Sequence, residues 1–274
     1  MKRRALAAIP LALGLAALLL IPAWLCGCGK KGQPPRERLE AAAKAAREAG
    51  SAHAQLFVSV SPREGEKGTS MNVQGDVWAD MEAGNMEARL TVLGMEVAVR
   101  YVEGRAYVRF GGQWYVLEGE IAQGVDEEAV TALAGLLGAA PEIVSAAEEV
   151  EKVGERKVGD DLCEVFSVKP DLPAIAALPA VREVGAALGM SEEEVVEYLE
   201  GAGVAIEVCV QKDAEIIRQV AAAADVELPD LGKVAGIPLL PESARLEITA
   251  DFPAFGVEVN VQVPPDARSV RDLL

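Results

Sequence analysis

Histidine and aromatic residues are scarce in this sequence, and signatures of catalytic sites are missing. The chain has one histidine, His53, and aromatic residues make up 4% of it. No Gly-x-Ser-x-Gly nucleophile motif accompanies His53, and residues 201–203, Gly-Ala-Gly, lack the lysine and preceding strand of a phosphate-binding loop. The acidic groups at 148–149, 160–161 and 192–194 are better explained as helix faces, turns and a helix start than as a metal site. We therefore expect no enzyme, no cofactor and no metal centre.

Basic residues are also few relative to acidic ones. Lysine and arginine number 26 against 43 aspartates and glutamates, a formal net charge of −17. Such a surface repels phosphate backbones and anionic head groups. Nucleic acid is therefore not an expected partner, whereas the charge says nothing about cargo held in an apolar cavity.

The N-terminus has the parts of a secretory signal. Lys2, Arg3 and Arg4 precede an apolar run over residues 5–25, and the segment Leu25-Cys26-Gly27-Cys28 follows. A cysteine at this place resembles the lipobox of bacterial lipoproteins, which implies removal of residues 1–27 and acylation of Cys28. An uncleaved membrane helix over residues 5–25 is the alternative, disfavoured by its two prolines. Either way the rest of the chain lies outside the cytoplasmic membrane, and the lipobox predicts a lipid anchor on its outer face.

Only two cysteines, Cys163 and Cys209, lie beyond the N-terminal segment. In an exported chain an even pair indicates a disulfide, which would constrain the unfolded chain by about 4 kcal/mol. Two free thiols are the alternative. A zinc site is disfavoured, because there is no second cysteine pair.

The chain after Cys28 divides into a short linker and one expected domain. Residues 28–35 are rich in Lys, Gly and Pro, and they keep the domain within roughly 25 Å of its anchor. Residues 36–49 have the composition and apolar spacing of a helix that ends at Gly50. From His53 the apolar period becomes two, with strands predicted from His53 and over 71–78.

Residues 85–117 predict a four-stranded antiparallel meander. Apolar residues alternate with polar ones, and Gly94, Glu103-Gly104 and Gly111-Gly112 supply tight turns. Helical patterns follow over 124–153, and residues 155–168 predict one strand. Helices are predicted again over 170–203, including a capping box of Ser191 and Glu194.

Four more strands are predicted over residues 204–211, 215–228, 243–251 and 256–263. Runs of strands with inserted helices indicate an antiparallel sheet with helices on one face. We therefore predict an α+β fold with a single domain over residues 36–274.

This order of elements resembles the LolA-like superfamily, and within it the lipoproteins grouped with LppX and LprG. The features that carry the resemblance are the lipobox, Gly104-Arg105-Ala106-Tyr107-Val108, Gly112-Gln113-Trp114-Tyr115, the hairpin at Lys212-Asp213 that leads into Ile216-Ile217-Arg218, and the predicted last strand with Pro264-Pro265-Asp266-Ala267. The resemblance implies a curved antiparallel half-barrel wrapped around helices, with an apolar cavity for lipid acyl chains. The sequence departs from the family pattern in its long alanine-rich helical segments and its few aromatic residues.

The apolar side of the predicted sheet supplies the candidate cavity residues. They are Leu90, Val92, Val97, Val99, Leu246, Ile248, Val257, Val259 and Val261. Ordinary core packing against the helices is the alternative for all of them, since sequence does not tell whether small helix residues leave room or allow close approach.

Two functional hypotheses follow from the resemblance. The first is a membrane-anchored carrier that moves lipid, glycolipid or lipoprotein between envelope layers, together with a transport partner. The second is an envelope sensor that uses the same sheet to bind a protein.

Overall fold

The computed structural model describes residues 33–63, 65–66, 68–117, 147–178, 181–182, 185–186, 190–227 and 243–269. The predicted signal segment 1–27, the lipidation site Cys28 and most of the linker lie outside the described residues. So do the helical patterns predicted within 124–146.

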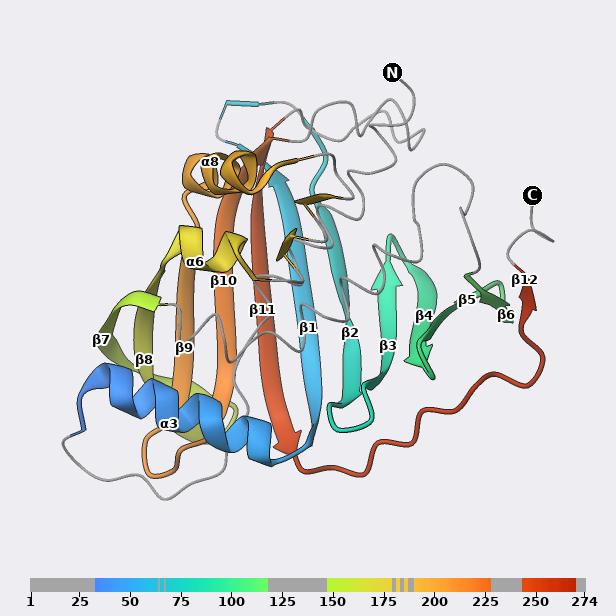
Figure 1. Ribbon diagram of the computed structural model, residues 1–274, viewed down its shortest axis with the longest axis horizontal. Coiled ribbons are helices and arrows are strands. Elements are labelled where there is room, and N and C mark those ends of the chain that lie inside the picture. The colour runs from blue at the N-terminus through green and yellow to red at the C-terminus, as the bar shows by residue number, and fades with distance from the viewer. Residues whose placement is uncertain are drawn as a thin grey trace.

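One open sheet of twelve strands forms the molecule's framework (Figure 1), in the order β12-β6-β5-β4-β3-β2-β1-β11-β10-β9-β8-β7. All pairings are antiparallel except the short parallel contact between β12 and β6. The strands are β1 (Ser51–Pro62), β2 (Met71–Asp80), β3 (Asn85–Val92), β4 (Met95–Val102), β5 (Arg105–Phe110), β6 (Gln113–Val116), β7 (Ala147–Val158), β8 (Asp161–Pro170), β9 (Ala205–Gln211), β10 (Ile217–Glu227), β11 (Ser243–Phe255) and β12 (Arg268–Ser269). The predicted α+β fold class, a large curved antiparallel sheet with helices, is confirmed.

The predicted meander is present as β3 to β6. Its first two turns place two successive residues at positive φ, Leu93 (51°) with Gly94 (79°) and Glu103 (54°) with Gly104 (72°). Positive φ at both central residues matches the right-handed twist of the flanking strands. The sequence prediction succeeded here because alternation and turn chemistry are both local.

The helices that the structure describes from end to end lie on one face of the sheet, over the half that contains β7 to β11 (Figure 1). They are α3 (Pro35–Glu48), α6 (Leu172–Ala176) and α8 (Glu192–Ala202). The predicted capping box is confirmed, because Ser191 Oγ accepts from the backbone N–H of Glu194, and the Glu194 carboxylate accepts from the backbone N–H of Ser191. None of the described helices is both long and apolar enough to span a membrane.

Arg38 fixes α3 to the sheet. Its Nη2 donates to the carbonyl oxygens of Gln211, Lys212 and Ala214 at 2.9, 3.0 and 3.0 Å, and its Nε donates to Glu164 Oε2 at 3.0 Å. Only 5% of Arg38 is exposed. A buried guanidinium is tolerable because a carboxylate and three carbonyls surround it.

The sequence reading was wrong in two segments. Residues 147–168 form two strands, β7 and β8, where a helix end and one strand were predicted; the turn between them contains Gly159 at φ 58°. Residues 256–263 form no strand, despite their regular alternation. That segment crosses from the end of β11 to β12 at the far edge of the sheet (Figure 1).

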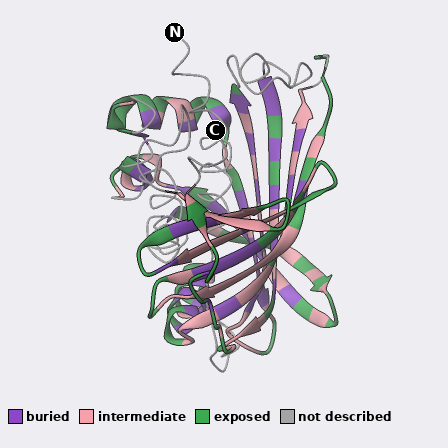
Figure 2. Cartoon of the chain, turned by 90° about the vertical axis from the view of Figure 1, so that its right-hand side faces the viewer, coloured by how far each residue is buried: buried purple, intermediate pink, exposed green. Residues whose placement is uncertain are grey.

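The sheet is strongly curved, and burial alternates along its strands (Figure 2). Gly75 in β2 lies between Leu56 of β1 and Leu90 of β3. A Cβ on Gly75 would lie 1.9 Å from the backbone oxygen of Arg89. Glycine is therefore required where β2 and β3 approach this closely.

Candidate functional site

The two faces of the sheet differ in chemistry. The inner face is the one on which α3, α6 and α8 pack, and it contributes β-strand residues to the main apolar core, among them Val58, Val208 and Val220. The outer face carries the alternate residues. Because successive side chains point to opposite faces, the strand register assigns each predicted residue to one face.

Leu246 and Ile248 belong to the filled core. They pair with Val60 and Val58 of β1, and only 1% of each is exposed. Both are members of the same buried cluster as Leu39 of α3. Leu246 and Ile248 are therefore packed in the core in this structure, and they offer no surface to a ligand.

Leu90, Val92, Val97 and Val99 lie on the inner face of β3 and β4. Leu90 pairs with Val97 and Ala88 pairs with Val99, which keeps the set on one side. All four are partly buried. Leu90 and Val92 also contact the main core, so the two regions are continuous.

Met95 and Phe110 extend this region toward the end of the sheet. They are 51% and 53% exposed, and alternation places them on the inner face with Val97 and Val108. The described helices lie over the opposite half of the sheet (Figure 1). We define the apolar patch as the following residues: Leu90, Val92, Met95, Val97, Val99 and Phe110.

The remaining predicted cavity residues lie elsewhere. Val259 and Val261 pack on the outer face of β4 to β6, in a second cluster with Val102, Tyr107 and Val116. Val257 belongs to the same irregular segment, and its carbonyl accepts from Ser51 Oγ at 2.6 Å. The alternation that suggested a strand instead reflects an extended chain that covers the outer face.

Cys163 and Cys209 are free, buried thiols in the structure, so the predicted disulfide between them is not formed there. Cys163 pairs with Gln211, and Cys209 pairs with Val165, which makes the two cysteines diagonal neighbours on β8 and β9. Diagonal positions lie about 7–8 Å apart, longer than the usual Cα separation across a disulfide of about 4.4–6.8 Å. Burial, together with nearby Cys209 and Asp161, raises the pKa of the Cys163 thiol to about 11.

Sequence reasoning missed a cluster of arginines and aromatic rings on the outer face. Glu87, only 6% exposed, accepts from Arg89 Nε at 2.7 Å and from Arg100 Nε at 2.8 Å. Arg89 lies over the ring of Trp78 at 5.1 Å, and Arg100 lies over Trp114 at 4.6 Å. These residues come from four strands, β2, β3, β4 and β6, and the register of the sheet brings them together.

No metal-binding group of three or more His, Cys, Asp or Glu side chains occurs within the described ranges. His53 contacts Asp76 at 2.7 Å and stacks on Trp78 at 4.9 Å between ring centroids. Asp76 and Trp78 both belong to the neighbouring strand β2.

No family model matches this sequence, and no curated protein sequence matches it significantly. Among solved structures, the chain is similar to LprF from Mycobacterium bovis, with 13% identity over 87% of this chain and 99% of that one and a TM-score of 0.48. It is similar to the lipoprotein LppX of Mycobacterium tuberculosis, with 12% identity, coverage of 79% and 93%, and a TM-score of 0.43. A putative outer membrane lipoprotein-sorting protein domain from Vibrio parahaemolyticus gives 6% identity, coverage of 77% and 88%, and a TM-score of 0.24.

These structures come from the groups that the sequence was predicted to resemble. Identities and TM-scores of this size carry no information about activity.

Proposed function

We propose that this protein is an envelope lipoprotein that binds lipid acyl chains on the apolar patch of its inner face. The observation that carries the proposal is the exposure of Met95 and Phe110 beside Val97 on a face that is otherwise the molecule's core. Large apolar side chains that are half exposed and contiguous mark a binding surface more often than a solvated one.

The energetics of such binding are favourable without any charged contact. Burying one methylene contributes about 0.8 kcal/mol, so a long acyl chain supplies ample affinity once a fraction of its length is covered. The patch is continuous with the core through Leu90 and Val92, which gives a chain a continuous apolar surface to follow.

The proposal also includes the anchor and the location. Acylation at Cys28 would hold a single domain over residues 36–274 at the outer face of the cytoplasmic membrane, where lipid or glycolipid and a transport partner are accessible. The short linker over 28–35 supports a role near that membrane.

The test is native mass spectrometry of residues 29–274, exported to an oxidising compartment, with solvent extraction of copurified lipid. We expect lipid at near-equal ratio to protein. Val97→Trp should reduce the bound fraction at least fivefold, because an indole placed on the patch occupies the path of the acyl chain.

Thr91→Trp is the matched control. Thr91 lies one position from Leu90 in β3 and is exposed on the outer face, so the same bulky residue there should leave lipid binding unchanged. Protein that is lipid-free, or lipid binding equally sensitive to both variants, would contradict the proposal. Capture of a protein partner that is insensitive to Val97→Trp would instead support the sensor function.

A further inference from the structure

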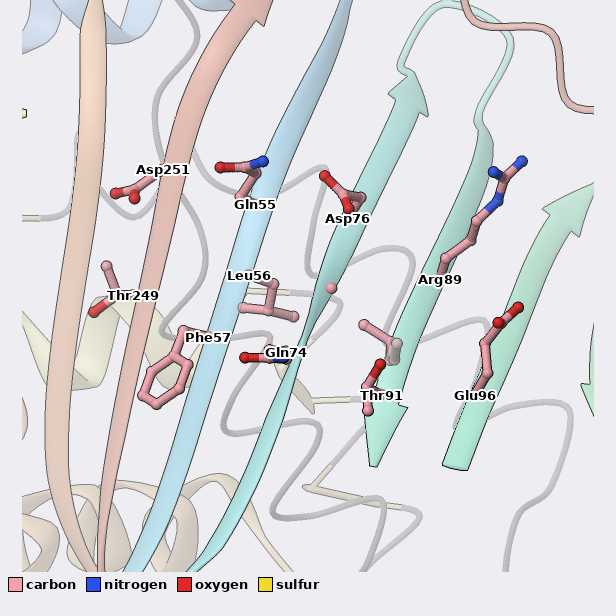
Figure 3. Close-up of a pocket in the computed structure, with 12 residues that line it drawn as sticks. Gln55, Leu56, Phe57, Gln74, Asp76, Arg89, Thr91, Glu96, Thr249 and Asp251 are labelled. Atoms are coloured by element: carbon pink, nitrogen blue, oxygen red, sulfur yellow. The ribbon is translucent and has the colours of Figure 1, made fainter. Parts of the chain in front are cut away.

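The outer face contains a hollow with a volume of about 610 Å³ (Figure 3). It spans β11, β1, β2, β3 and β4, on the side of the sheet opposite the apolar patch. We call it the outer hollow, and its lining residues are Gln55, Leu56, Phe57, Gln74, Gly75, Asp76, Arg89, Leu90, Thr91, Glu96, Thr249 and Asp251. This volume lies within the range of about 300–1,000 Å³ of small-ligand sites.

Strand register arranges the lining side chains in two rows across the sheet. The first row runs Asp251, Gln55, Asp76 and Arg89. The second row runs Thr249, Phe57, Gln74, Thr91 and Glu96. Cross-strand neighbours on one face lie about 5 Å apart, so each row presents polar groups at short, regular intervals.

The charged members of these rows already have partners. Asp76 Oδ1 contacts His53 Nε2 at 2.7 Å, and Asp251 Oδ1 accepts from Gln219 Nε2 at 2.8 Å. Arg89 pairs with Glu87, and Glu96 pairs with Arg109. The charged groups of the outer hollow are therefore each held by a partner, and its second row is uncharged from Thr249 to Thr91.

Four neutral polar side chains in the outer hollow make no side-chain hydrogen bond to any residue that the structure describes. They are Gln55, Gln74, Thr91 and Thr249. Each glutamine offers two N–H donors and an acceptor oxygen, and each threonine hydroxyl both donates and accepts. Such groups complement a ligand that itself carries many neutral donors and acceptors.

Phe57 adds an apolar ring among these polar groups. It is 43% exposed, and the close-up shows it within the hollow between Thr249 and Gln74 (Figure 3). Trp78, by contrast, is already in contact with His53 and Arg89. Phe57 is thus the aromatic surface that remains open to a ligand.

We propose that the outer hollow binds a carbohydrate. A sugar ring has an apolar C–H face that can stack on Phe57, and its vicinal hydroxyls can exchange hydrogen bonds with Gln55, Gln74 and Thr91. The lining disfavours two other classes of ligand: three carboxylates repel an anion, and the polar rows would leave unpaired groups beneath an acyl chain. Apart from Leu90, this site shares no residue with the apolar patch, and its polar rows lie on the opposite face, so it is tested independently of the lipid proposal.

The test is saturation-transfer difference NMR on the full chain in polyoxyethylene ether micelles, a detergent without sugar groups. The probes are maltotriose, cellotriose and an α-linked mannotriose, with a trisaccharide-sized polyethylene glycol as the negative probe. We expect transfer to at least one trisaccharide and a dissociation constant that Phe57→Ala raises at least tenfold. Gln74→Ala should raise it at least threefold.

Phe110→Ala and Val97→Trp serve as matched controls, because Phe110 is a phenylalanine on the inner face that is exposed at least as far as Phe57, and Val97 belongs to the apolar patch. Neither should change saccharide binding, and Phe57→Ala should not change the copurified lipid. Absence of transfer to all three saccharides would overturn the proposal. So would transfer that survives Phe57→Ala, or stronger binding of a lysine-rich peptide that competes with the sugar.

Discussion

Glu164 shows how single residues couple the helix layer to the sheet. Burial raises the pKa of this carboxyl, but hydrogen bonds from Lys152 and Arg38 outweigh the burial and leave the pKa below its ordinary value of 4.5. The partners lie at 2.6 Å for Lys152 Nζ and 3.0 Å for Arg38 Nε. The ionised form of Glu164 is therefore favoured by folding.

Because folding lowers the pKa of Glu164, the ionised carboxylate stabilises the folded protein. The contribution of Glu164 to stability is fully present above the unfolded pKa and is lost as pH falls through the lower folded pKa. We expect Glu164→Gln to lower the free energy of unfolding by about 1–2 kcal/mol at pH 7. The difference from the wild type should shrink steadily below pH 4.5.

Urea unfolding followed by circular dichroism at pH 7 and near pH 3 measures this difference. Glu193→Gln is a suitable control, because Glu193 is exposed in the first turn of α8 and forms no ion pair with any residue that the structure describes. If Glu164→Gln lowered the free energy of unfolding equally at both pH values, the lowered pKa of Glu164 would be contradicted.

At the scale of elements, Gly75 allows the close approach of β2 to β3 that joins β3 to β6 to the rest of the sheet. Gly75→Ala places a methyl group 1.9 Å from the backbone oxygen of Arg89, and a backbone atom of a paired strand does not move aside easily. We expect this substitution to destabilise the fold by about 2–4 kcal/mol, as for other steric conflicts in a core.

Gly154→Ala is the matched control, because Gly154 also lies inside a strand, β7, and a Cβ there meets nothing within 4 Å. Its effect should stay within about 0.5 kcal/mol. Thermal unfolding of the two variants measures the comparison. Equal stabilities would show that β2 and β3 are not as close at Gly75 as the structure places them.

The elements that sequence reasoning predicted well are those whose signals are local. The β3 to β6 meander follows from alternation and glycine turns, and α8 follows from Ser191 and Glu194. β7 was missed because it is an edge strand whose outward side chains stay charged and whose bulges, near Glu149 and Gly154, interrupt the alternation. Its composition of Glu, Lys and Val is equally typical of the end of a helix.

The candidate site was predictable only in part, because the pairing register of the strands decides which face of the sheet a side chain lies on, and the sequence does not give that register. Val97 and Val259 alternate equally well in sequence, yet one lies on the inner face and the other covers the outer face. Leu246 and Leu90 share a face but differ in burial, and the helices that the structure describes lie over the half of the sheet that contains Leu246. The outer hollow joins residues of five strands and has no local sequence signal.

At the scale of the whole molecule, the two buried thiols report on the integrity of the sheet. Cys163 and Cys209 are 0% exposed, and they lie on β8 and β9, four or more strands from Gly75 in β2. Burial is the main reason why the pKa of both thiols is raised. Since the thiolate is the reactive form, both thiols are poor nucleophiles in the folded protein.

We expect neither thiol to react with a disulfide reagent at pH 7.5 in the native protein, and both to react in 6 M guanidinium, because exposure requires opening of β8 and β9. Under native conditions labelling should be at least 10³-fold slower than for an unfolded peptide. If Gly75→Ala accelerates labelling by the factor that its loss of global stability predicts, the twelve strands unfold as one unit. Labelling that stays slow in that variant would mean that the half of the sheet covered by helices is stable without the half that carries the apolar patch. A denatured wild-type chain with no reactive thiol would show that Cys163 and Cys209 are oxidised to a disulfide.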